Sequence, residues 1–280
     1  MIDYVQASKS SSQPLLENFY TEWSRKTPAE IEFDIKVSIE KSGAALSLLE
    51  DTNIGPVNSV LEVGCGFGRN LVEVMNRTGA SYGLGCDFSE ETIEYAKKHY
   101  ENKSIRFFRN SSLDIESTVS QLRKIYDKPF DLVILFDTLE HIPGPKTFIR
   151  ALSSVSRYFL IKLPLEDSIL DNYLLPVRKR YPCSLHPDGH LREFHVNNVH
   201  QFVVSLGLTP LKYDLYEYSI NTLFPGHIRP AHLKGKLFFE MLRMIKCAAR
   251  YMLPRRVFLR IIGGGGFVCL AKWDPEFVLE

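Results

Sequence analysis

Short runs of β-branched and aromatic residues alternate along this chain with longer stretches in which apolar residues recur every three or four positions. The short runs predict strands and the longer stretches predict helices. Regular alternation of the two is typical of a parallel sheet with helices on both faces. The expected strands are 59–63, 82–86, 105–109, 130–136 and 158–163, and the expected helices between them are 68–77, 89–101, 113–126 and 146–155.

The remaining segments complete the sheet and add helices outside it. Residues 209–218 and 267–273 predict two further strands that close the sheet as an antiparallel pair. The fold class is therefore α/β, a doubly wound, mostly parallel seven-stranded sheet (Rossmann-like) with an antiparallel last strand. Residues 28–50 predict a helix within an N-terminal helical cover, 1–56. The sheet and its helices form one domain, 57–219 with 263–280.

Two segments are expected to form a helical lid. Residues 164–190 leave the carboxyl end of the fifth strand, and the basic helical insertion 220–262 leaves the carboxyl end of the sixth. In a sheet of this type, ligands bind beyond the carboxyl ends of the parallel strands. Both segments therefore begin on the ligand-binding side, where they would build the substrate pocket.

A turn with glycine at every second position follows the first strand. Glu62 precedes Gly64, Gly66 and Gly68, and the next helix begins directly afterwards. Glycines let the main chain approach a ligand without Cβ clashes, and the helix N-terminus points at that ligand. The spacing differs from the G-x-G-x-x-G that binds a pyrophosphate, which an acidic residue would repel. The acid suits a ligand with a cationic part, and S-adenosylmethionine is a cationic nucleoside.

Five motifs in their order along the chain resemble the class I S-adenosylmethionine-dependent methyltransferases, especially the small-molecule group that includes the quinone-biosynthesis O-methyltransferases. The motifs are 61–68, 85–89, 130–133, 139–142 and 190–194. The resemblance covers about 57–218 and implies an enzyme that transfers a methyl group from S-adenosylmethionine. It also implies a set of cofactor-binding residues: Glu62, Gly64, Gly66, Asn70, Asp87, Phe88, Asn110, Ser111 and Phe136.

The resemblance assigns a role to several of these residues. Asp87 ends the second strand, where the family's acidic residue accepts the ribose hydroxyls, and Phe88 would lie against the adenine. Phe136 would line the methionine arm, where an aromatic face attracts a sulfonium. Asn110 and Ser111 would meet the adenine amino group, although the family more often has an acidic residue there.

Methyl transfer from a sulfonium mainly requires that the acceptor be held in line behind the methyl group. A general base is needed when the acceptor is a hydroxyl or a protonated amine. His141, just beyond the fourth strand, is the first candidate because an imidazole titrates near neutral pH. A histidine that caps the following turn is the other interpretation of His141. His186, in the expected lid, is the second candidate base.

No metal is expected, but one alternative stays open. Asp137, Glu140 and His141 resemble the acid-x-x-Glu-His trio to which some quinone O-methyltransferases bind a divalent cation. Two carboxylates and an imidazole could hold magnesium or zinc. The family often has Glu where this chain has Asp137.

Composition bears on where the protein is located and on what it contacts. The 280 residues are 45% hydrophobic, yet they contain no 18-residue apolar run, and the first twelve residues are polar. We therefore expect a cytoplasmic protein without a spanning helix or signal peptide. The five cysteines form no CxxC pair, which argues against a zinc knuckle. Residues 176–280 carry 15 Lys and Arg against 8 Asp and Glu, so this part would meet an anionic partner or present a solvated basic surface.

The basic insertion contains an amphipathic pattern. Residues 236–253 predict a helix with Lys236, Arg243, Lys246 and Arg250 on one half and apolar residues on the other. We expect the apolar half to pack on the core while the basic half faces solvent or an anionic substrate. The alternative is peripheral contact with the inner face of an anionic membrane, which would suit a lipid-linked acceptor.

The sequence favours O-methylation over N-methylation of a small-molecule or glycan/lipid-linked acceptor. Residues 136–139 lack the Asn/Asp-Pro-Pro-Tyr/Phe motif of enzymes that methylate nucleobase or amide nitrogens. An RNA-modifying enzyme is an alternative supported only by the basic half, and no DNA partner is expected. A nicotinamide enzyme is disfavoured by the glycine spacing and by Glu62. A non-catalytic scaffold subunit is disfavoured by the intact cofactor motifs.

Overall fold

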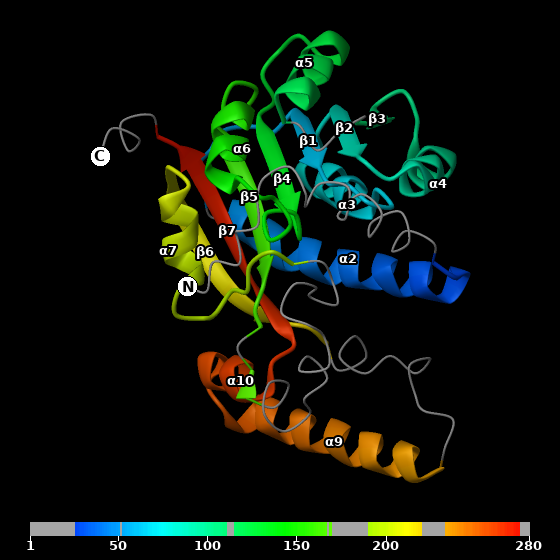
Figure 1. Cartoon of the computed structure of the whole chain (residues 1–280), viewed down its shortest axis with the longest axis vertical. Coiled ribbons are helices and arrows are strands. Elements are labelled where there is room, and N and C mark those ends of the chain that lie inside the picture. The colour runs from blue at the N-terminus through cyan, green and yellow to red at the C-terminus, as the bar shows by residue number, and fades with distance from the viewer. Residues whose placement is uncertain are drawn as a thin grey trace.

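The computed structural model describes residues 26–50, 52–110, 115–166, 168–169, 190–219 and 233–274. In these residues a seven-stranded sheet runs in the order β3-β2-β1-β4-β5-β7-β6 (Figure 1). The strands are β1 (Ser59–Val63), β2 (Tyr82–Asp87), β3 (Ile105–Arg109), β4 (Leu132–Phe136), β5 (Tyr158–Pro164), β6 (Leu208–Glu217) and β7 (Gly265–Trp273).

Strand pairing confirms the predicted fold class. The pairs β1–β2, β1–β4, β2–β3 and β4–β5 are parallel. Strand β7 lies antiparallel between β5 and β6, so β6 runs in the same direction as the first five strands. The chain order reverses between β1 and β4, and the crevice outside the carboxyl ends of these strands is where an open α/β sheet binds its ligands.

Helices cover both faces of the sheet (Figure 1). One face packs against α2 (Pro28–Glu50), α3 (Arg69–Thr78) and α4 (Glu90–Tyr100), which contribute Ala45, Leu48, Leu71, Val74, Ile93 and Ala96 to one buried cluster. The other face packs against α5 (Ile115–Ile125), α6 (Pro145–Leu152), α7 (Val199–Ser205) and α10 (Arg255–Ile262), which contribute Leu122, Ile149, Leu152, Phe202, Phe258 and Leu259 to a second cluster. The remaining described helix is α9 (Leu233–Met252).

Local chemistry explains why the hydrophobic pattern located most elements. Every residue of β1 and β4 is buried, because helices lie on both faces, and such strands give continuous apolar runs. Helix α4 begins where the Ser89 hydroxyl accepts a hydrogen bond from the Thr92 amide, with an N···O distance of 3.3 Å. This is the N-cap that the serine at this position favours.

The structure differs from the expected elements at three places. Strand β4 begins at Leu132, and Phe130 makes only an isolated bridge to Ser156. Helix α7 falls in a segment to which the pattern assigned no bounds. Helix α10 is separate from α9 because Pro254 interrupts the helical hydrogen bonds and then serves as the N-cap position of α10.

The insertion between β6 and β7 starts and ends on the ligand-binding side. Glu217 at the end of β6 is the register partner of Gly265 at the start of β7. Figure 1 shows α9 and α10 at one end of the molecule, beyond the carboxyl ends of the parallel strands. Most of the expected lid segment 164–190 and residues 220–232 lie outside the described residues. Among the described helices, none is long and apolar enough to cross a membrane.

Candidate functional site

A cavity of about 480 Å³ opens beyond the carboxyl ends of β1, β2 and β4, and α2 forms one of its walls. This volume is in the range of small-molecule sites. The cavity brings together most of the residues that the sequence singled out. Those at its wall are Gly64, Gly66, Asn70, Asp87, Phe88, Asn110, Phe136, Asp137 and His141.

The glycine turn needs its glycines for two different reasons. Gly64 has a φ of 79°, and a Cβ at this position would lie 2.8 Å from the Thr138 hydroxyl oxygen. Gly66 has a φ of 49°, and a Cβ there would meet nothing within 4 Å, because it would point into open space at the cavity wall. The turn therefore packs on Thr138, just beyond β4, at one glycine and leaves room for a ligand at another.

Asp87 at the end of β2 is oriented by backbone amides. One carboxylate oxygen accepts a hydrogen bond from the Gly66 amide at 2.8 Å, and the other accepts one from the Ser89 amide at 2.9 Å. Burial raises the pKa of this carboxyl above its ordinary value, and the two amides oppose that shift. The carboxylate is thus held rigidly at the cavity wall, with lone pairs left to accept hydrogen bonds from a ligand.

The neighbours of Asp87 on β2 and β3 form one end of the cavity. Phe88 is half-buried at the wall, and Asn110 is buried directly after β3. The backbone amide of Asn110 donates a hydrogen bond to the backbone carbonyl of Asp87 at 3.0 Å, and this bond joins the ends of the two strands. Ser111, predicted beside Asn110, lies outside the described residues.

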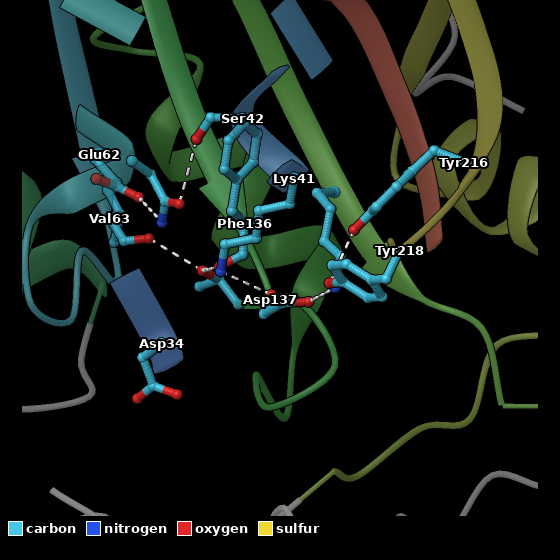
Figure 2. A network of polar contacts seen from close by, with 12 residues as sticks. Asp34, Lys41, Ser42, Glu62, Val63, Phe136, Asp137, Tyr216 and Tyr218 are labelled. Carbon is cyan, nitrogen blue, oxygen red and sulfur yellow. Dashed lines mark hydrogen bonds and ion pairs between the residues drawn. The ribbon is translucent and has the colours of Figure 1, made fainter. Parts of the chain in front are cut away.

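Glu62 does not line the cavity, which changes the meaning of the acid before the glycines. It is fully buried, and its Oε1 accepts a 2.9 Å hydrogen bond from the side-chain amide of Asn70. Asn70 lines the cavity, and its Oδ1 accepts a hydrogen bond from the Ser42 hydroxyl on α2 (Figure 2). Glu62 therefore fixes the orientation of Asn70.

The electrostatic state of Glu62 also departs from the expectation. Burial raises its pKa to about 8, although the Asn70 hydrogen bond and the Lys41 charge pull the pKa down. Its other carboxyl oxygen is buried without a hydrogen-bond partner. With this pKa the carboxyl favours its protonated form at neutral pH in the empty protein, so the negative charge that the sequence suggested for a cationic ligand is not in place before the ligand binds.

The charged centre of the cavity is instead Asp137, which binds two lysines; Figure 2 shows it beside Lys41. Lys41 of α2 pairs with one carboxylate oxygen at 2.9 Å, and Lys162 of β5 pairs with the other. Burial alone would raise the pKa of Asp137, but the ammonium groups of Lys162 and Lys41 hold this pKa well below its ordinary value. One negative charge thus faces two positive charges, and the cluster is net positive.

The lysines were not anticipated from the sequence. Lys162 sits inside a buried apolar strand, and Lys41 is one of two lysines on α2. For both lysines, burial alone would lower the pKa, but Asp137 raises it above the ordinary value. The ammonium of Lys162 also lies 5.8 Å from the ring centroid of Tyr218. In the sequence, the one sign of this charged cluster was a lysine, Lys162, within an otherwise apolar predicted strand.

Asp137 adopts an unusual backbone conformation. Its φ is 51°, and it is the one non-glycine residue with a positive φ in the part of the chain that the structure describes. Such a conformation costs about 1–3 kcal/mol and is concentrated at functional sites. Here it directs the carboxylate into the gap between α2 and β5, where the two lysines hold it.

Two histidines lie beyond the end of β4. The rings of His141 and His190 are 4.8 Å apart in an edge-to-face arrangement, and both line the cavity. Nδ1 of His190 lies 3.0 Å from a carboxylate oxygen of the buried Glu166. From the sequence, His141 was a candidate base, whereas His190 was only the first residue of the motif 190–194. His186, the second candidate base, lies outside the described residues.

The structure brings together a different set of candidate metal ligands from the one that the sequence suggested. Both carboxylate oxygens of Asp137 are engaged by lysines, so the expected trio is not assembled. Glu140, His141 and His190 have candidate ligand atoms within 4.8 Å of one another. Burial, reinforced by Asp137, raises the pKa of Glu140 well above its ordinary value. A cation here would have to displace a proton from that carboxyl.

Residues 60–158 match the model of a methyltransferase domain family. The sheet order, the glycine turn and the cavity at the ends of β1, β2 and β4 agree with that match. Residues 60–158 are therefore similar to a methyltransferase domain, and the described fold around them is compatible with that similarity.

Among curated proteins, the chain is similar to ubiquinone biosynthesis O-methyltransferases. It is 37% identical over 101 residues to the mitochondrial protein of Dictyostelium discoideum, which covers 35% of this chain and 31% of that protein. It is 30% identical over 129 residues to the protein of Hahella chejuensis, which covers 46% of this chain and 51% of that protein. The chain thus spans about a third to a half of these relatives.

Solved structures share the fold over nearly the whole chain. A magnesium protoporphyrin IX methyltransferase from Synechocystis PCC 6803 with bound SAH superposes with a TM-score of 0.54 at 12% identity, covering 93% of this chain and 99% of that one. A SAM-dependent methyltransferase from Archaeoglobus fulgidus superposes with a TM-score of 0.50 at 17% identity, covering 91% and 98%. At these identities the likeness concerns the fold alone.

Proposed function

We propose that this chain transfers a methyl group from S-adenosylmethionine to a hydroxyl oxygen of a small-molecule or glycan/lipid-linked acceptor. The observation that carries the proposal is the Asp87 carboxylate, which two backbone amides fix at the cavity wall beside the glycine turn. A carboxylate in this position suits the paired hydroxyls of a ribose, because charge-assisted hydrogen bonds are roughly twice as strong as neutral ones.

The other wall residues suit the remaining parts of the methyl donor. Phe88 offers a face to the adenine, and Asn110 offers an amide to its polar edge. The open space at Gly66 leaves room for the sugar. We place the carboxylate of the methionine arm near Lys41, because this ammonium lies at the cavity wall in a cluster of net positive charge.

When bound, S-adenosylmethionine supplies a methyl group on a positively charged sulfur, which departs as a neutral thioether. The protein then has to hold the acceptor oxygen in line with that methyl group and accept the hydroxyl proton. We assign the proton to His141, which lies at the cavity wall beyond β4. The neighbouring His190, held by Glu166, is the alternative acceptor of that proton.

Calorimetry with S-adenosylhomocysteine tests the cofactor part of the proposal. We expect Asp87→Asn to weaken binding by roughly 10- to 100-fold, because hydrogen bonds to a charged group are lost. The matched control is Asp127→Asn, an exposed residue outside the cavity wall. Absence of binding to the wild-type protein, or equal loss in both variants, would contradict the proposal.

The dependence of rate on pH tests the base. We expect His141→Gln to remove the acidic limb of the profile, while the affinity for S-adenosylhomocysteine stays unchanged. His190→Gln is the comparison: if it alone removes that limb, the proton goes to His190. If a chelator abolishes the activity and a divalent cation restores it, His141 acts as a metal ligand and the assignment of a base is wrong.

For the acceptor, the relatives' names suggest a phenolic hydroxyl such as that of a quinone precursor. We favour this class over RNA and over a scaffold role, because the named relatives are O-methyltransferases. A cytoplasmic location, in part peripheral to the inner face of a membrane, would suit a lipid-linked acceptor. A screen of phenols and glycolipids with a labelled methyl donor tests this; labelling of RNA alone would contradict it.

A further inference from the structure

Helix α9 exposes much of its apolar side, which we expected from the sequence to pack on the core; only Ala249 and Leu253 of that side do so among the described residues. Its exposed large side chains are Met241, Met244, Ile245, Tyr251 and Met252, with exposed fractions of 48, 66, 50, 88 and 80%. At 100° per residue these positions, together with exposed Ala248, fall within one 120° sector. We call this sector the outer face of α9. The side chains of residues 233–240, 242 and 243 lie outside the description.

The side of α9 that faces the domain is mixed, because Ala249 and Leu253 pack against the core beside two basic residues. Lys246 is buried, and the Arg250 guanidinium binds Glu217 at 3.1 Å and donates to the Tyr218 carbonyl. The helix is therefore attached to the end of β6 by its basic residues. An ordinary surface helix buries its apolar stripe and exposes its charges. Here the exposed apolar residues of the outer face of α9 remain available for an apolar environment.

The segment that carries this face is rich in basic residues, of which Arg250 and Arg255 pair with the acidic Glu217 and Asp214 of β6. Residues 241–262 contain six Lys and Arg and no Asp or Glu. Arg256 and Arg260 on α10 are exposed next to the exposed Val257 and Ile261, and no ion pair to either arginine occurs in the described part of the chain. Apolar side chains beside unpaired arginines are the combination that binds the surface of an anionic bilayer.

We propose that the outer face of α9, with Arg256 and Arg260 of α10, docks on an anionic lipid bilayer. The apolar side chains would enter the boundary between headgroups and acyl chains, and the arginines would meet lipid phosphates. The segment that carries this surface leaves β6 at the carboxyl edge of the sheet, and the cavity opens at the carboxyl ends of other strands along the same edge. The proposal concerns a binding surface and does not depend on methyl transfer.

Vesicle flotation of the full chain without methyl donor tests the proposal. The vesicles contain phosphatidylcholine alone or with about 30% phosphatidylglycerol. We expect clear binding only to the anionic vesicles, and a loss of binding at high salt because surface charges are screened. Equal binding to both vesicles, or binding to neither, would overturn the proposal.

Two sets of variants separate the parts of the surface. Arg256→Gln with Arg260→Gln should weaken partition by about 25-fold. Met244→Ser, Tyr251→Ser and Met252→Ser together should weaken it by more than about 100-fold. The matched controls are Lys124→Gln with Lys128→Gln and Ile125→Ser, which change exposed residues around α5 and should leave partition unchanged.

Stability and oligomeric state decide between the bilayer and another occupant. We expect the serine variant to melt at the wild-type temperature and the wild type to sediment as a monomer. A large loss of stability would mean that another part of this chain covers the outer face of α9. A dimer that the serine substitutions dissociate would mean that a second copy covers it. Either result, with unchanged vesicle binding, overturns the proposal.

Discussion

Lys41 is the residue whose charge the cavity makes most available to a ligand. Its ammonium already binds Asp137, but an ammonium has three donors, and the residue lines the cavity. We expect Lys41→Met to weaken binding of S-adenosylhomocysteine by about 10-fold or more, because a charge-assisted contact to the methionine carboxylate is lost.

The same substitution should barely change binding of 5′-methylthioadenosine, which has no carboxylate. Titration calorimetry measures the affinity of the wild type and of the variant for both ligands. Lys36→Met serves as the control, since Lys36 is exposed on the same helix and pairs with Glu32. Equal losses for the two ligands would show that Lys41 supports the structure of the site and does not contact the carboxylate.

Glu62 gives the empty protein a pH-dependent stability. Its folded pKa is about 8, above the ordinary value of 4.5, so the folded state holds a proton that the unfolded state has lost. The free energy of unfolding should therefore fall as the pH rises from about 4.5 to 8. We expect Glu62→Gln to lack this fall, so that the variant gains on the wild type by up to about 1.4 kcal/mol per pH unit.

Urea unfolding at pH 5 and pH 8 measures this difference for both proteins. Titrating groups that the two proteins share contribute equally and cancel in the comparison. If the free energies of unfolding of the two proteins differ by the same amount at both pH values, Glu62 is ionised in the folded protein. A positive charge nearby would then have to stabilise its buried carboxylate.

Among the secondary-structure elements, Asp137 connects three that are distant in sequence. It follows β4, and its two lysines come from α2 and β5. Replacing it by asparagine would leave two buried ammonium groups facing each other without a counter-charge. We expect Asp137→Asn to lower the free energy of unfolding at pH 7 by about 3–5 kcal/mol.

The pH dependence of that loss has a definite sign. The folded pKa of Asp137 is depressed, so the stabilisation is present above the unfolded pKa of about 4 and disappears as the pH falls further. Chemical unfolding at pH 7 and pH 3 should show a smaller difference between wild type and variant at pH 3. Asp131→Asn does not serve as the control, because Asp131 ties β1 to β4 through Ser59; exposed Asp127→Asn does.

The elements themselves were largely predictable, but their orientation was not. Local sequence is enough to predict strands that are buried on both faces and a capped helix such as α4. An amphipathic pattern such as that of α9 defines two faces without saying which one meets the domain. Here the ion pair between Arg250 and Glu217 decides, and no local pattern contains a contact between residues 33 positions apart.

At the scale of the whole molecule, the fold followed from the order of strands and helices, whereas the charge of the site did not. The glycine turn and Asp87 were readable because each needs a particular residue at a particular strand end. The pKa of Glu62 and the ion pairs of Asp137 with its two lysines depend on burial. That burial arises only once α2 and β5 pack beside β4 in the folded chain. The sequence therefore indicated the cofactor more clearly than the acceptor.

The pairing of Glu217 with Gly265 has a consequence for how such chains can vary. The segment between β6 and β7 leaves and re-enters the sheet at adjacent positions, so its length is independent of the strand register. Closing a longer loop there costs entropy that grows only slowly with the number of residues. In the part of the chain that the structure describes, the segment is tied to the domain by the buried side chains of α10, by Ala249 and Leu253, and by the ion pairs of Arg250 and Arg255. This junction is a point where a chain can exchange one attached module for another while the sheet and the cavity remain as they are.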